Sequence, residues 1–278
     1  MFRVVLTFDD NYIDMGLACI NSIVDTRLYS KDKINVDVLC FKDSLSQKNI
    51  EKLEALSTKN TTVKVVQVDK EYCDQLNANA KPYGRHVNPI TWLRLTVPKI
   101  YTKRDTVVYV DADICFRTDI KQFIDAYNNP NQWIVGFQHR VNTVGDIVKD
   151  SLTAAFFVYN LKVIDKDKWF GLLEKYNPVS IHDETCINQM FQEIEHSSHL
   201  PNEKFCNRAC VTQIPNSMLD NDDYLMYINK RFDEQYRTAE IVHYAGEPKP
   251  KFDRTNFTDS LFAFNYLAAK RKLKLRGK

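Results

Sequence analysis

The sequence predicts an α/β protein built on a single, mixed but mostly parallel β-sheet with helices on both sides. Short apolar runs rich in β-branched residues alternate along the chain with segments whose apolar residues recur at helical spacing. This alternation is typical of parallel sheets, because parallel neighbours need a crossover connection. Polar residues follow the runs at residues 3–8 and 107–110, which are strand ends of the kind where open α/β sheets bind ligands.

The N-terminal part of the chain predicts three strands separated by two helices. Residues 3–8 form an apolar run, and residues 15–23 carry apolar side chains on one helical face. Residues 34–41 alternate in polarity and then become apolar, as in a strand that enters a core. Residues 46–56 begin with a Ser suited to cap a helix. Residues 63–68 are rich in Val and are the third strand.

The rest of the chain continues the pattern of apolar strands and amphipathic helices. A Pro in the first turn begins a helix at residues 89–97, and acidic residues that suit the helix dipole begin another at residues 182–194. Residues 197–238 have no clear period and predict one or two edge strands, a loop and a short helix near Tyr224. The remaining predicted elements are strands at 107–110, 133–137, 152–160 and 241–244, helices at 119–127 and 163–176, and loops at 81–88, 138–150 and 245–250.

Composition excludes several classes of protein. The 278 residues carry a net charge of +2, so nucleic acid is not expected as a partner. No apolar run is long enough to span a membrane, and the first residues lack the apolar core of a signal peptide. Seven scattered cysteines favour a reduced, cytoplasmic setting. The seven glycines form neither a dinucleotide-binding loop nor a Walker loop, so a nucleotide would need another mode of phosphate binding.

Asp111 and Asp113 stand one residue apart, directly after the apolar run at residues 107–110. Two carboxylates at this spacing can bind one Mg²⁺ or Mn²⁺ ion, because these cations prefer hard oxygen ligands. Such a cation commonly completes its coordination shell with substrate phosphate. A solvated Asp pair in a turn is the alternative, because so short a motif often occurs by chance.

The chain shows no internal repeat and no linker, so residues 1–255 are expected to form one domain followed by a basic helical tail at residues 256–278. Six of the last nine residues are Lys or Arg. This composition is typical of a solvated helix end, where cations suit the helix dipole. Peripheral contact with an anionic membrane is the alternative. A homodimer is also compatible with the sequence.

Four short motifs with compatible spacing occur in order between residue 1 and about residue 251. They are Asp9-Asp10-Asn11-Tyr12, Arg85-His86-Val87 with Thr91-x-x-Arg94-Leu95, Asp111-Ala112-Asp113, and His243-x-x-Gly246-x-x-Lys249-Pro250. Together they resemble the retaining glycosyltransferase family GT8, which includes lipopolysaccharide galactosyltransferases and glycogenin. The resemblance implies the GT-A fold, with a UDP-sugar as the donor substrate.

The resemblance also implies a role for each motif. Asp111, Asp113 and His243 would bind the metal. A neutral imidazole suits Mn²⁺ better than Mg²⁺, so Mn²⁺ is the expected cofactor and Mg²⁺ the alternative. Donors near the diphosphate would stabilise the charge of the departing UDP. The residues expected to contact the nucleotide, its phosphates or the donor sugar are Thr7, Asp9, Asn11, Tyr12, His86, Arg94, Asp111, Ala112, Thr153, Gly246 and Lys249.

The resemblance places the sugar pocket at Thr153 and at Asp183-Glu184. Thr153 stands where the family commonly has Asn, which leaves the choice of donor sugar open. Asp183 is expected to contact a sugar hydroxyl. Glu184 stands where Gln is frequent, and its carboxylate could act as a nucleophile or stabilise positive charge at the anomeric carbon. An ordinary acidic helix start is the alternative for both residues.

These expectations define a metal-dependent, retaining hexosyltransferase. It would move glucose, galactose or N-acetylglucosamine from a UDP-sugar to a hydroxyl of a glycan, a lipid-linked glycan or a protein. A sugar-nucleotidyltransferase is one alternative, although such enzymes usually begin with a Gly-rich phosphate loop. A non-catalytic module that binds a UDP-sugar or a glycan is another. Self-glucosylation also stays open, because the fourteen tyrosines include no marked acceptor.

Overall fold

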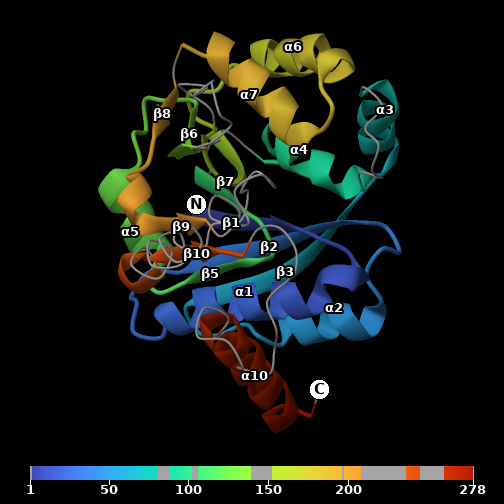
Figure 1. Ribbon diagram of the computed structural model, residues 1–278. Coiled ribbons are helices and arrows are strands. Elements are labelled where there is room, and N and C mark those ends of the chain that lie inside the picture. Colours follow the sequence, from blue (N-terminus) through green and yellow to red (C-terminus); the bar gives the residue numbers. More distant parts are fainter. Residues whose placement is uncertain are drawn as a thin grey trace, which may run out of the picture.

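A mixed, mostly parallel β-sheet lies between two layers of helices in the computed structural model (Figure 1). The structure describes residues 2–80, 88–101, 106–138, 152–195, 197–207, 236–244 and 260–277. Within these ranges seven strands form the main sheet, in the order β3-β2-β1-β4-β7-β6-β8. Only the pairs that β7 makes with β4 and β6 are antiparallel among these strands. The strands are β1 (Phe2–Thr7), β2 (Ile34–Phe41), β3 (Thr61–Val68), β4 (Thr106–Val110), β6 (Ile134–Gln138), β7 (Leu152–Asn160) and β8 (Ser197–His199).

Alternate residues of the central strands enter two different hydrophobic cores. In β4, Val108 and Val110 face the core beside the N-terminal helices, whereas Val107 and Tyr109 face the core on the other side. Helices therefore cover both faces of the sheet (Figure 1), as the sequence predicts. The first layer contains α1 (Ile13–Thr26), α2 (Gln47–Glu54) and α5 (Ile120–Tyr127), and the second contains α3 (Glu71–Asn79), α4 (Leu93–Ile100), α6 (Lys166–Tyr176) and α7 (Asp183–Glu193).

Several elements differ from the sequence prediction. Helix α3 was not predicted, because only Cys73 and Leu76 are buried in it and its periodic signal is weak. The helix expected at residues 89–97 begins instead as a 3₁₀ turn, Pro89–Trp92, and continues as α4. Strand β8 and the short strand β9 (Phe205–Asn207) confirm the edge strands expected in residues 197–238. The loops predicted around residues 81–87, 139–150 and 245–250 and the helix near Tyr224 lie outside the described residues.

A second, smaller sheet, which we call the small sheet, joins distant parts of the chain. In the described part of the chain it contains β5 (Ile114–Phe116), β10 (Ile241–His243) and β9, in the order β5-β10-β9. Strand β10 is antiparallel to β5, and His243 lies opposite Ile114. The small sheet rests on α1, where the Oγ atom of Ser22 accepts a hydrogen bond from the Phe116 backbone at 3.1 Å. The pairing therefore brings the end of β10 next to the end of β4.

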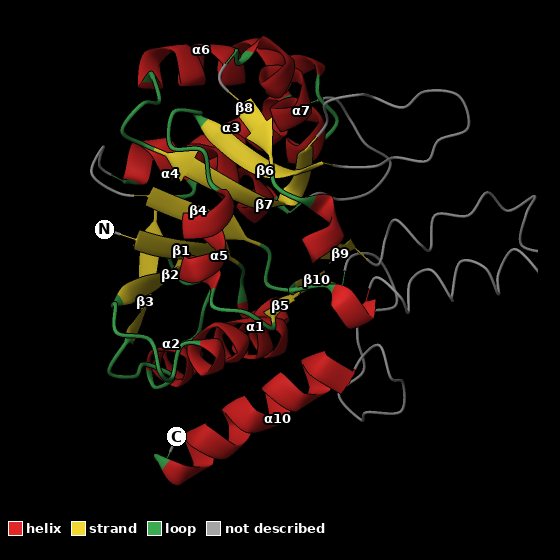
Figure 2. Cartoon of the chain, turned by 90° about the vertical axis from the view of Figure 1, so that its left-hand side faces the viewer, coloured by secondary structure: helices red, strands yellow, loops and turns green. Residues whose placement is uncertain are grey.

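The basic end of the chain forms helix α10 (Ser260–Leu275), which packs along α1 (Figure 2). One face of α10 is buried, and Lys270 and Lys274 on another face are exposed. Helix α10 therefore has one face packed on the protein and, on another face, exposed Lys residues as in the solvated helix end that the sequence favoured. No helix in the described ranges is both long and apolar enough to cross a membrane.

Candidate active site

The turn after β4 carries the two aspartates that the sequence singled out. The backbone N–H of Asp111 donates to the carbonyl oxygen of Ala155 in β7 at 2.9 Å, which keeps Asp111 in register with the main sheet. The N–H of Ile114 then donates to the Asp111 carbonyl at 3.2 Å, which closes the turn before β5 begins. Ala112, in the middle of the turn, is buried. The chain thus leaves one sheet and enters the other within three residues, with one carboxylate at each end of the turn.

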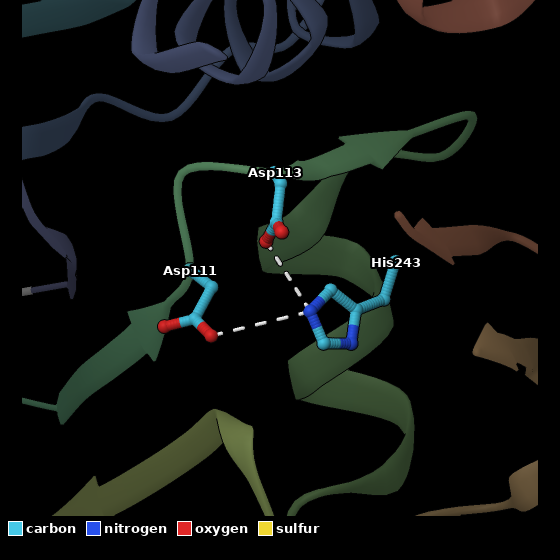
Figure 3. A group of neighbouring side chains, drawn as sticks. All are labelled: Asp111, Asp113 and His243. Carbon is cyan, nitrogen blue, oxygen red and sulfur yellow. Dashed lines mark ion pairs between the residues drawn. The ribbon is translucent and has the colours of Figure 1, made fainter. Parts of the chain in front are cut away.

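His243 joins these carboxylates from the end of β10. Its Nε2 atom lies 3.2 Å from Oδ1 of Asp113 and 4.0 Å from Oδ2 of Asp111. The three side chains point toward one another (Figure 3), and one potential ligand atom from each lies within 4.8 Å of the others. The antiparallel pairing of β5 with β10 produces this approach, and the N–H of Tyr244 reinforces it by donating to the Asp113 carbonyl at 2.9 Å.

The donor set of this cluster fits a divalent cation. Two carboxylate oxygens and one imidazole nitrogen are suitable ligands for Mn²⁺. The side chains of Asp113 and His243 are only 9% and 7% exposed, whereas the Asp111 side chain is 23% exposed, so the cluster is closed on one side and open on the other. Nδ1 of His243 is buried and has no hydrogen-bond partner among the described residues. An imidazole that binds a metal through Nε2 keeps its proton on Nδ1, so Nε2, which faces the two aspartates, is the nitrogen available to a metal.

Tyr109 and Arg94 fix the orientation of the Asp111 carboxylate. The Tyr109 hydroxyl donates to Oδ1 of Asp111 at 2.6 Å, and a terminal nitrogen of Arg94 lies 3.1 Å from the same oxygen. The Thr7 hydroxyl lies 3.0 Å from that of Tyr109. Burial raises the pKa of Tyr109 well above its ordinary value, so the hydroxyl stays protonated and can donate. With Oδ1 held by protein donors, Oδ2 is the oxygen that faces His243.

Arg94 connects the metal-ligand candidates to the start of α7. Its Nε atom lies 2.9 Å from Oδ2 of Asp183, and its Nη1 atom donates to the Ala154 carbonyl at 2.6 Å. The guanidinium also lies over the Tyr109 ring, 4.8 Å from the centroid. Burial alone lowers the pKa of Arg94, but the charges of Asp111 and Asp183 outweigh it and raise that pKa. Arg94 was expected to contact the donor, and it lies between two carboxylates that were assigned to different parts of the site.

Two of the three residues expected at the sugar pocket, Asp183 and Glu184, lie beside this arginine. Asp183 is the first residue of α7 and is buried. Its burial raises its pKa, although the charge of Arg94 acts in the opposite direction. Oε1 of Glu184 accepts a hydrogen bond from the Ala154 backbone at 3.3 Å. Thr153 is buried in the same stretch of β7. The start of α7 therefore brings Asp183 and Glu184 beside Arg94 and Ala154, and Thr153 is the neighbour of Ala154 in β7.

Comparison with known proteins identifies the family of this chain. The model described as "Glycosyl transferase family 8" matches residues 3–169, which is more than half of the sequence. The chain belongs to glycosyl transferase family 8. No curated protein sequence matches it.

Solved structures confirm the GT-A fold of this family 8 protein. The galactosyltransferase LgtC in complex with donor and acceptor sugar analogues aligns with a TM-score of 0.69 and 18% identity, over 96% of this chain and 95% of LgtC. The bifunctional glycosyltransferase WbbM aligns with a TM-score of 0.70 and 20% identity over 99% of this chain, which spans 51% of WbbM. The glycosyltransferase GlyE from Streptococcus pneumoniae TIGR4 aligns with a TM-score of 0.63 and 13% identity, over 100% of this chain and 65% of GlyE.

The loop after β1 in this family 8 protein is tied to the segment before α4. Asp9 accepts hydrogen bonds at 3.0 Å from the Asn11 backbone and from the Asn88 side chain. Asn11 and Tyr12 are exposed. Asp10 points elsewhere, because its carboxylate accepts from the backbone N–H of Ser46 at 3.1 Å, at the start of α2. Among the predicted site residues, His86, Gly246 and Lys249 lie outside the described residues.

Sequence reasoning missed two contributors to the site, Tyr109 and Asn88. Tyr109 could have been found from the strand period, because residues 109 and 111 lie on the same side of an extended chain. No comparable signal marked Asn88, whose side chain also accepts from the Ile90 backbone at 3.1 Å and so caps the 3₁₀ turn before α4. Asn commonly forms local hydrogen bonds of this kind. Only the tertiary structure shows that the Asn88 side chain also reaches Asp9.

Proposed function

We propose that this family 8 protein transfers a hexosyl unit from a UDP-sugar to a hydroxyl group of a glycan, a lipid-linked glycan or a protein, with retention of the anomeric configuration. The observation that carries this proposal is the cluster of Asp111, Asp113 and His243, joined through Arg94 to Asp183. Glucose, galactose and N-acetylglucosamine are the candidate sugars, and the likeness to the galactosyltransferase LgtC makes galactose the first to test.

The cluster would bind a divalent cation, Mn²⁺ in preference to Mg²⁺. When bound, the cation supplies positive charge that stabilises the diphosphate of the UDP leaving group. Asp111 would present Oδ2 to the cation, because its other oxygen accepts from Tyr109 and faces Arg94. Lys249 and the backbone N–H of Gly246 would donate hydrogen bonds to the diphosphate. Asp9, Asn11, Tyr12 and His86 would hold the uracil and the ribose.

On the sugar side, Asp183 and Glu184 would act on different atoms of the donor. Arg94 fixes Asp183, so its carboxylate would accept a hydrogen bond from a sugar hydroxyl. Glu184 is held by the Ala154 backbone and would stabilise positive charge at the anomeric carbon or attack that carbon directly. Thr153 would line the same pocket, and because it is shorter than Asn it would leave more room beside the sugar.

The test is a panel of UDP-sugars incubated with the protein and Mn²⁺, with released UDP as the readout. We expect metal-dependent release from one donor and its loss in Asp113→Ala. Asp125→Ala is the matched control, because Asp125 is exposed on α5 and pairs only with Lys121 among the ion pairs of the described residues. Magnetic resonance of the product sugar would report the anomeric configuration.

Two further measurements separate the rival activities. Release of pyrophosphate from UTP and a sugar 1-phosphate would indicate a sugar-nucleotidyltransferase. Tight UDP binding without turnover, unchanged by a screen of acceptors, would indicate a binding module. Absence of binding to every UDP-sugar, with and without Mn²⁺, would refute the proposal.

A further inference from the structure

Helix α10 reaches the small sheet that carries His243. Phe262, near the start of α10, is fully buried. Its ring packs edge-on against Tyr244, with 5.3 Å between the ring centroids and an interplanar angle of 71°. Both rings belong to one hydrophobic cluster with Cys115 of β5 and Val242 of β10. The C-terminal helix therefore contributes to the core directly behind the small sheet.

Tyr244 links this packing to two of the three candidate metal ligands. It follows His243 in the chain, and its backbone N–H donates to the Asp113 carbonyl at 2.9 Å. The Phe262 ring thus contacts a residue that is one peptide bond from one ligand and one hydrogen bond from the other. A displacement of Tyr244 would change the separation of Nε2 of His243 and Oδ1 of Asp113, which is 3.2 Å.

Polar contacts along α10 and just beyond its end hold the helix in place. The Lys272 ammonium group contacts the Asp25 carboxylate and lies 2.8 Å from the side-chain oxygen of Asn21, both on α1. The Asn265 side-chain oxygen accepts a hydrogen bond from Asn21 at 3.0 Å in the buried interface. Arg276 donates to backbone carbonyls beyond α2, one of them that of Ser57 at 3.1 Å. Figure 2 shows the resulting alignment of α10 beside α1.

We infer that α10 is a positioning element for the metal site, in which Phe262 acts through Tyr244 to set the spacing of Asp113 and His243. The inference rests on the proposed function, in which these residues bind a divalent cation. Outer groups that orient ligands strongly affect metal affinity. A close-packed interior transmits small displacements because it has few voids. Loss of the Phe262 ring would leave a cavity into which Tyr244 can relax.

The test compares Phe262→Ala with Phe264→Ala. Phe264 is two residues away on the same helix and is 55% exposed, so the control removes the same ring from the surface. The readout is the Mn²⁺ dissociation constant, measured from the paramagnetic resonance signal of free Mn²⁺ at a temperature where both variants are folded. We expect Phe262→Ala to bind Mn²⁺ about tenfold more weakly and Phe264→Ala to match the wild type. Excess Mn²⁺ should then restore turnover in Phe262→Ala, which a purely structural role of the ring would not predict.

Wild-type affinity in a folded Phe262→Ala variant would overturn the inference and leave the metal site intact. A wild-type protein whose Mn²⁺ binding is absent or insensitive to Asp113→Ala would overturn the metal site and the inference together. If Phe262→Ala does not fold, the test uses Lys272→Met, which removes a contact between α10 and α1. Lys274→Met is its control, because Lys274 is exposed on the same helix. Weaker Mn²⁺ binding in Lys272→Met alone supports the inference, and equal binding in both Lys variants refutes it.

Discussion

The Nε atom of Arg94 lies 2.9 Å from the Oδ2 atom of Asp183, and both side chains are buried. The same guanidinium lies 3.1 Å from the carboxylate of Asp111. The Arg94 guanidinium therefore connects the end of β4 to the start of α7. Since two nearby carboxylates repel each other, the guanidinium between Asp111 and Asp183 offsets that repulsion with favourable interactions on both sides.

Replacing Arg94 should destabilise the protein by leaving the buried carboxylate of Asp183 and the partly exposed carboxylate of Asp111 without their counter-charge. We expect Arg94→Met to lower the free energy of unfolding by about 3–5 kcal/mol. Arg94→Lys should cost less, because it keeps the charge, but an ammonium group cannot bridge two carboxylates as a planar guanidinium does. Urea unfolding of both variants measures these differences. A change in Arg94→Met within about 0.5 kcal/mol, the usual range for surface positions, would show that the bridge contributes little.

Asp183 should make stability depend on pH. Its folded pKa is raised above the ordinary value of 3.8, chiefly by burial. The folded state therefore binds the proton more tightly than the unfolded chain, and the resulting stability is fully present below pH 3.8 and is lost as pH rises through the folded pKa. Relative to Asp183→Asn, the wild type should lose stability over that window.

Urea unfolding of both proteins at a series of pH values measures the effect, and Asp125→Asn on the exposed face of α5 is the control. A constant difference between the wild type and Asp183→Asn at every pH would contradict the raised pKa.

Tyr109→Phe should weaken Mn²⁺ binding, although the shape of the side chain changes little. The variant removes the hydroxyl that lies between Thr7 and the Oδ1 atom of Asp111, so the carboxylate is oriented by Arg94 alone among these contacts. We expect about a tenfold increase in the Mn²⁺ dissociation constant, typical of losing a group that orients a ligand. Tyr101→Phe is the matched control, because the Tyr101 hydroxyl donates to Asp37, a buried carboxylate away from the metal cluster. Equal affinities in the two variants would argue against an orienting role for Tyr109.

Two glycines in helices should respond in opposite ways to alanine. A Cβ atom at Gly16 in α1 would lie 2.3 Å from Cζ of the buried Phe8 ring, whereas a Cβ at Gly171 in α6 meets nothing within 4 Å among the described residues. Gly16→Ala should lower the free energy of unfolding by about 1–3 kcal/mol through overpacking. Gly171→Ala should raise it by about 0.5–1 kcal/mol, because Ala favours a helix more than Gly does. Urea unfolding measures both, and equal effects would contradict the packing argument.

The fold was largely predictable because most elements have local signals. The β-branched run before Asp111 predicted β4, and the strands β2 and β7 have the predicted bounds. Elements with weak local signals were missed. Strand β5 has three residues, and such a segment becomes a strand only through its pairing with β10.

The sequence by itself determined which side chains are available for chemistry. Asp111 and Asp113 were candidates from residue type and spacing, and His243 became one through the resemblance that the four motifs carry. Only the tertiary structure decided how His243 reaches the two aspartates, which is through the pairing of β10 with β5. It also decided that Arg94 bridges Asp111 and Asp183, and that α10 packs against α1 and the small sheet. These contacts join residues far apart in the chain. They depend on strand pairing and helix packing, which bury surface that no short stretch of sequence can bury alone.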